Sequence, residues 1–114
     1  MEQQDEASEQ RKARNETLFR DANESVRDVQ EDLGITGGLM PFLCECEEPT
    51  CRGIIKVAQS DYEAVRAHPR HFLLVPGHEG HGERVVEEHS SYFIVEKFGL
   101  SGEIAEATDP RKES

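Results

Sequence analysis

Three cysteines within eight residues are the feature of this sequence most able to do chemistry. The segment from Met40 to Gly53 reads MPFLCECEEPTCRG and holds Cys44, Cys46 and Cys51. Two cysteines two positions apart point the same way in an extended segment, and the Glu-Glu-Pro-Thr turn can bring the third back to them. Three thiolates on one side of a loop predict a zinc site, because Zn²⁺ takes four ligands and prefers thiolate and imidazole donors.

The fourth zinc ligand has to come from another part of the chain. His78, in the segment VPGHEGHG, follows a Pro-Gly pair that predicts a turn, where the backbone can approach a metal closely. His81 and His89 remain alternatives, whereas His68 and His71 are disfavoured because they flank a predicted helix end. The predicted ligands of a structural Cys3His site are Cys44, Cys46, Cys51 and His78.

Two other interpretations of the cysteines stay open. Zinc held by thiolates can be released when an oxidant attacks sulfur, which would make the site a redox switch. A zinc-dependent enzyme is a weaker alternative, because a catalytic zinc needs an open coordination position and a general base. Carboxylates that could serve are near the cluster, at Glu45, Glu47, Glu48 and Glu79. Four protein ligands leave no open position, so we predict no catalytic residues.

A long helix is expected before this site. Residues 8 to 34 form an amphipathic helix by their spacing, and Gly34 suits the left-handed cap at its end. At about 100° per residue its apolar side chains fall on one stripe, which has to bury itself on its own domain, on a second copy or on a partner protein. The predicted partner-binding residues are Leu18, Phe19, Ala22, Val26, Val29 and Leu33.

The remaining elements predict an α+β fold. Residues 41 to 98 form a small zinc-binding domain, with antiparallel strands at 42–46, 53–58, 71–75, 84–89 and 92–98. One short helix should begin at Ser60, whose hydroxyl and the Glu63 carboxylate match a capping box. A domain of about 60 residues has a small core, so a metal would help to stabilise it. Residues 1–7 and the acidic tail 99–114 lack such patterns and are expected to be disordered.

The charge of the chain limits its partners. The net charge of −11 over 114 residues would be repelled by nucleic acid and by anionic lipid, where binding depends on Lys and Arg. The start, MEQQDEASEQ, is acidic where a signal peptide is basic and then apolar, and no segment approaches the roughly 20 apolar residues of a membrane helix. We therefore expect a cytoplasmic protein with protein partners and without direct contact to nucleic acid or membranes.

Several segments also carry a resemblance to a known group. FLCECEEPTCRGII, DYEAVRAHPRHFLLVPGHE and RVVEEHSSYFIVEK, after the helix segment NETLFRDANESV, resemble small uncharacterised proteins of high-GC Gram-positive bacteria. The resemblance covers residues 14 to 98 and departs at Ser90-Ser91, where that group often has an Asp-Gly turn. It implies the same four ligands and no particular reaction. We expect a zinc-stabilised adaptor or regulator that contacts another protein through its helix, rather than an enzyme.

Overall fold

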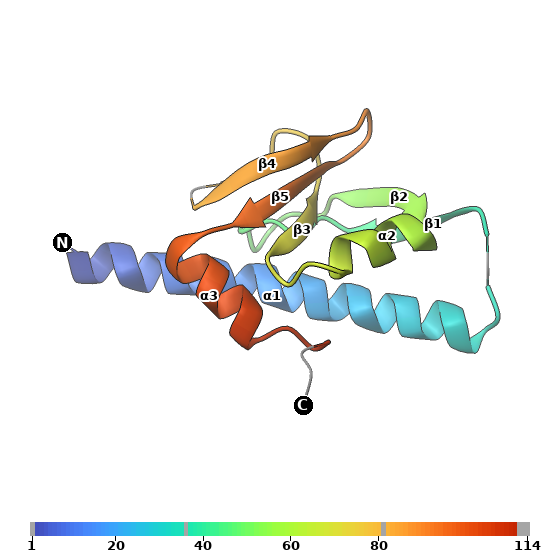
Figure 1. The fold of residues 1–114 in the computed structure, drawn as a ribbon, viewed down its shortest axis with the longest axis horizontal. Coiled ribbons are helices and arrows are strands. Elements are labelled where there is room, and N and C mark those ends of the chain that lie inside the picture. The colour runs from blue at the N-terminus through green and yellow to red at the C-terminus, as the bar shows by residue number, and fades with distance from the viewer. Residues whose placement is uncertain (1, 36, 81, 112–114) are drawn as a thin grey trace.

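A computed structural model describes residues 2–35, 37–80 and 82–111, and the fold is α+β as expected. A long helix, α1 (Glu2–Asp32), runs along one side of two small antiparallel sheets (Figure 1). The first sheet pairs β1 (Leu39–Leu43) with β2 (Ile54–Ala58). The second has the order β3-β5-β4, from β3 (His71–Leu74), β4 (Glu83–Glu88) and β5 (Phe93–Lys97). Two shorter helices complete the fold, α2 (Gln59–Arg66) and α3 (Gly99–Ala107).

The core forms where the two sheets and α2 meet. In β1 and β2 the buried residues alternate with exposed ones, as expected for strands with one face on a core. Phe42 of β1 stacks on Tyr62 of α2 with their ring centroids 4.3 Å apart. The central part of β3 is buried on both faces, at Phe72, Leu73 and Leu74. Each predicted strand is present, with its ends shifted by up to three residues.

The prediction of a disordered tail from residue 99 is wrong. Residues 99–107 form α3, which packs against α1, and Arg20 of α1 donates from Nη2 to the Ala105 carbonyl at 3.1 Å. Small side chains hide this helix from periodicity analysis, because its buried positions are Ser101, Gly102 and Ala105. A Cβ atom at Gly102 would lie 2.9 Å from the Lys97 carbonyl oxygen, so the small residue permits the close approach.

Two other predicted boundaries need correction. The helix α1 already begins at Glu2, so the expected disorder does not extend over residues 2–7. The expected capping box of α2 does not form: the helix begins at Gln59 without a side-chain cap, and the Glu63 carboxylate pairs with Arg27 and Arg111 instead. At the other end of α1, Gly34 has a φ of 70° and ends the helix as predicted.

Polar residues, rather than the apolar stripe, attach α1 to the rest of the molecule. Apart from Ala13, the buried side chains of the part of α1 with described side chains are Glu16, Thr17, Arg20, Asn23 and Gln30. Arg20 donates to the carbonyl oxygens of Pro69 at 3.0 Å and Ala105 at 3.1 Å, and its guanidinium lies 4.9 Å from the ring centroid of Phe72. At about 100° per residue these positions fall on one side of the helix, so they form one polar face turned toward the domain.

The predicted apolar stripe lies to the side of this buried face and away from it. Leu18 is 64% exposed, Val29 56% and Leu33 70%. Phe19, Ala22 and Val26 are half-buried, and Val26 packs on the edge of the core. The helix therefore docks on its own domain while half of its apolar stripe stays open. None of the helices within the described residues is long and apolar enough to cross a membrane.

A buried cluster of three ionisable side chains joins α1 to the second sheet. The Lys97 ammonium lies between the carboxylates of Glu16 from α1 and Glu83 from β4, and all three side chains are almost fully inaccessible to water. Burial raises the pKa of Glu16 to about 8; Lys97 lowers it and Glu83 raises it. One ammonium cannot neutralise two carboxylates, so protonated Glu16 beside a Lys97–Glu83 pair is the favoured state.

Replacing Glu16 with Gln should remove part of the pH dependence of folding. The folded pKa of about 8 exceeds the unfolded value of 4.5, so the stability from this group is complete below pH 4.5 and is lost as the pH rises through 8. Wild type should therefore lose stability relative to Glu16→Gln over this range, by at most about 1.4 kcal/mol per pH unit. Urea unfolding at several pH values measures this, with exposed Glu103→Gln as control. Parallel curves for wild type and Glu16→Gln would contradict the assignment.

Candidate metal centre

The loop between β1 and β2 brings the three cysteines together. The hairpin continues one pair past the strands, since the Cys44 N–H donates to the Gly53 carbonyl at 3.0 Å. A turn then returns the chain, and the Cys51 N–H donates to the Glu48 carbonyl at 3.1 Å. Gly53 leaves room for the site, because a Cβ atom there would lie 2.8 Å from Val75 Cγ2 and 3.2 Å from Cys44 Cβ.

The fourth predicted ligand reaches the loop from a separate turn after β3. The His78 N–H donates to the Val75 carbonyl at 3.0 Å, which closes a tight turn, and Gly77 has a φ of 90° at its third position. That left-handed conformation is the one that Gly adopts without a steric penalty. The Pro-Gly pair therefore aims the His78 imidazole back at the cysteines, as the sequence predicts.

The four ligand atoms gather closely enough to surround one metal ion. They all lie within 4.8 Å of one another, and His78 Nδ1 is 3.5 Å from Cys44 Sγ and 3.6 Å from Cys51 Sγ. With metal bonds of about 2.3 Å to sulfur and about 2.0 Å to nitrogen, a tetrahedron places S and N about 3.5 Å apart, close to both of these S–N distances. The Cys44, Cys46, Cys51 and His78 cluster can therefore hold a metal ion.

The cysteine thiols of this cluster are buried, so their ionised form needs a cation beside it. Cys44 and Cys46 are both 1% exposed, and burial raises the pKa of each of these thiols. A backbone donor partly favours the Cys44 thiolate, since the Val75 N–H lies 3.2 Å from Cys44 Sγ. The Gly53 N–H donates to Cys51 Sγ at 3.4 Å. A bound metal would supply the remaining stabilisation of the thiolates, so we expect metal binding to release protons.

The other described histidines do not approach the cysteines. His68 and His71 stack on each other at 4.3 Å, and His71 Nε2 lies 3.2 Å from Glu96. His89 stacks on Tyr92 and pairs with Glu87. His81 lies outside the described residues. Among the described histidines, only His78 takes part in the cluster.

A buried carboxylate supports the metal loop from behind. Glu45 stands between two ligands but points the opposite way, into the core, where its carboxylate accepts hydrogen bonds from Asn23 Nδ2 at 2.8 Å, Tyr62 Oη at 2.7 Å and the Leu73 N–H at 3.0 Å. Asn23 also bonds both backbone groups of Leu43, at 2.7 and 2.8 Å. Burial raises the pKa of Glu45, while these donors lower it.

The sequence did not predict that Glu45 and Asn23 support the metal site. It indicated Glu45 only as a carboxylate near the metal, and it did not indicate Asn23. The alternation of an extended segment gives a usable signal, because a residue between two ligands must face away from them. No such signal exists for Asn23, whose partners are 20 and 22 positions away.

Comparisons with known proteins assign no relative to this chain: no family model, curated protein or solved structure matches it.

Replacing His78 with Ala should lower metal content and thermal stability together. His78 is the ligand that ties the turn after β3 to the cysteine loop, and metal binding is coupled to folding. Elemental analysis and thermal unfolding of the purified variant measure both effects. His89→Ala removes an exposed imidazole outside the cluster and is the matched control. A full and tightly held metal in His78→Ala would refute the ligand assignment.

Glu45→Gln should weaken both the fold and the metal site. The glutamine NH₂ group would face one of the hydrogen-bond donors that now bond a carboxylate oxygen. The lost hydrogen bond should lower the free energy of unfolding by about 1–3 kcal/mol. Groups that support ligands typically change metal affinity by about 10–100-fold. A chelator competition assay and urea unfolding would measure the two losses, with exposed Glu48→Gln in the same loop as control. Equal losses in both variants would show that Glu45 has no special role.

Proposed function

We propose that the metal is a structural zinc ion held by Cys44, Cys46, Cys51 and His78. Three thiolates and one imidazole in a tetrahedron suit Zn²⁺ and fill its four positions. The S–N distances of 3.5 and 3.6 Å support this choice. Metal analysis of wild type, beside the His78→Ala variant, tests it: we expect one zinc per chain, and another metal or none would contradict the proposal.

The role proposed for the molecule is that of a protein-binding adaptor or regulator. The observation that carries this proposal is the open apolar side of α1, where Leu18, Val29 and Leu33 remain exposed although the helix is fixed to its domain. A docked helix that presents apolar side chains to water offers a rigid surface for a protein partner. Zinc supports this role by holding the loop beside the helix in place.

The geometry supports the two alternatives less well. An oxidant would reach a redox switch through its sulfur atoms, but Cys44 and Cys46 are each only 1% exposed. Cys51 is more accessible than these two cysteines, and its N–H donates to the Glu48 carbonyl. An enzyme would need an open metal position, which four protein ligands do not leave, and Glu45, the carboxylate between two of the ligands, points into the core.

Substituting two residues of the apolar stripe should abolish partner binding and leave the fold intact. Leu18→Ser/Val29→Ser removes exposed apolar surface, so stability should change by less than about 1 kcal/mol. Affinity capture from cells that produce the protein compares this variant with wild type. Ile54→Ser, at an exposed apolar position on β2, is the control. Identical captured proteins for all three baits would remove the stripe from the proposal.

A further inference from the structure

The open side of α1 carries a charge gradient as well as apolar residues. On this side the basic residues Arg11 and Arg14 lie toward the N-terminal end and the acidic residue Asp32 lies at the C-terminal end. Three neighbouring charges are paired within the chain: Lys12 pairs with Glu47, and Arg27 pairs with both Asp28 and Glu31. Two such helices side by side in parallel would place like charges together at both ends. In the antiparallel direction each basic end meets an acidic end, so the helix is complementary to a reversed copy of itself.

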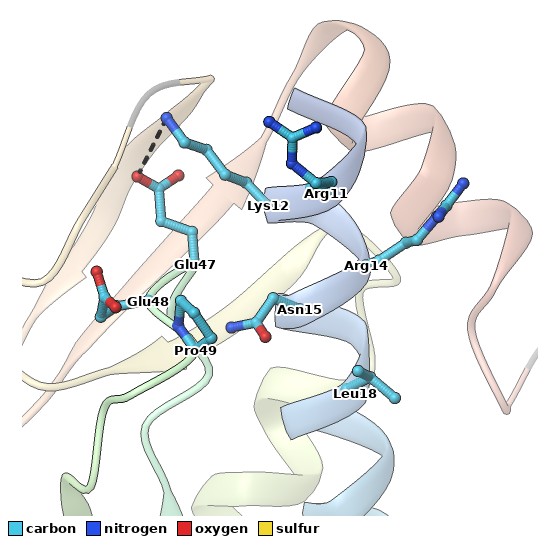
Figure 2. A pocket seen from close by; sticks show the side chains of 8 residues that line it. All are labelled: Arg11, Lys12, Arg14, Asn15, Leu18, Glu47, Glu48 and Pro49. Carbon is cyan, nitrogen blue, oxygen red and sulfur yellow. Dashed lines mark ion pairs between the residues drawn. The ribbon is translucent and has the colours of Figure 1, made fainter. Parts of the chain in front are cut away.

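A hollow lies beside the basic end of α1. Its volume is about 490 Å³, and it is bounded by the helix on one side and by the metal loop on the other (Figure 2). Lys12 and Asn15 point from α1 toward the loop, where Lys12 lies 3.8 Å from Glu47, whereas Arg14 points to the other side of the helix (Figure 2). The lining residues are Arg11, Lys12, Arg14, Asn15, Leu18, Glu47, Glu48 and Pro49.

We propose that this surface binds a second copy of the chain, with the two α1 helices antiparallel. The proposal rests on the protein-binding role of the apolar stripe and names its partner. Leu18 lies opposite Val29 of the second copy, and the exposed Leu33 of the second copy enters the hollow next to Asn15. Asp32 of the second copy lies beside Arg14. Two-fold symmetry makes every one of these contacts twice.

The helical positions agree with this arrangement. At about 100° per residue, Leu18, Ala22, Val29 and Leu33 fall within about 60° of one another, on the side opposite the buried face. The centre of the pairing then lies between Ala22 and Ser25, whose small side chains let two helices approach closely.

The two flanks of the helix also agree. A two-fold antiparallel pair brings the same flank of both helices together. Arg14 and Asp32 fall on one flank, so they can form a charge pair between the copies. Asn15 and Leu33 fall on the other flank, which is the side of the hollow. One antiparallel alignment of the two helices therefore allows both the apolar contacts and the charge pair.

The size of the surface sets the strength of the association. The helix from Arg11 to Leu33 is about 33 Å long, which gives a contact at the small end of stable interfaces. Each copy also carries a net charge of −11, which opposes association. We therefore expect a reversible dimer with a dissociation constant in the micromolar range, about 1–100 μM.

Sedimentation velocity of the full chain with bound metal tests the proposal, from about 1 to about 300 μM, a range that spans this dissociation constant. Wild type should change from monomer to dimer. Arg14→Glu alone and Asp32→Arg alone should each raise the dissociation constant about tenfold or more, because like charges then meet. An equal mixture of the two variants should dimerise again, since opposite charges face each other at both ends. Lys56→Glu, at an exposed position on β2, is the matched charge-reversal control.

Each outcome decides the proposal. Wild type that stays monomeric throughout overturns self-pairing. The adaptor role would then depend on the capture experiment alone, where binding of another protein would still require Leu18 and Val29. A dimer that Arg14→Glu does not weaken more than Lys56→Glu overturns the antiparallel alignment. Concentration-dependent dimerisation, weakened by each single reversal and restored in the mixture, supports it.

Discussion

The buried carboxylate of Glu45 is the interaction on which the other parts depend. It accepts hydrogen bonds from Asn23 of α1, Tyr62 of α2 and the backbone of Leu73 in β3. Because a buried carboxylate that loses a donor is costly, these three elements and the metal loop must adopt one arrangement together. The ligand Cys44 lies next to Glu45 in sequence, so the position of the metal site and the docking of the long helix are set by the same contacts.

The polar attachment of α1 explains how a helix can be fixed to its domain and still present apolar residues. Arg20, Asn23 and the Glu16–Lys97 pair each need partners at defined positions, so the helix cannot slide or rotate without leaving buried polar groups unpaired. Such contacts contribute more to the register of the helix than to net stability. An apolar docking face would have tolerated several registers, and it would have used up the stripe that now includes Leu18.

The sequence is informative where chemistry is local and uninformative where partners are distant. The ligand set followed from three cysteines in one loop and a histidine on a Pro-Gly turn, because thiolate and imidazole have few other reasons to gather. The strands followed from alternation. The face of α1 that docks on the domain could not be predicted, because periodicity detects an apolar stripe but not what the stripe contacts. Lys97, the partner of Glu16, is 81 positions away, and α3 was missed because its buried side is made of small residues such as Gly102.

The metal loop has two faces, and this links the site to the surface of the molecule. One face carries the ligands, and the other forms a wall of the hollow beside α1 through Glu47 and Pro49. Glu47 pairs with Lys12 of the helix at 3.8 Å and lies against Gly80, where a Cβ atom would push its carboxylate aside. The turn that holds Gly80 also holds the ligand His78. A metal that fixes both loops therefore fixes the shape of the hollow, although no ligand of the metal lines it.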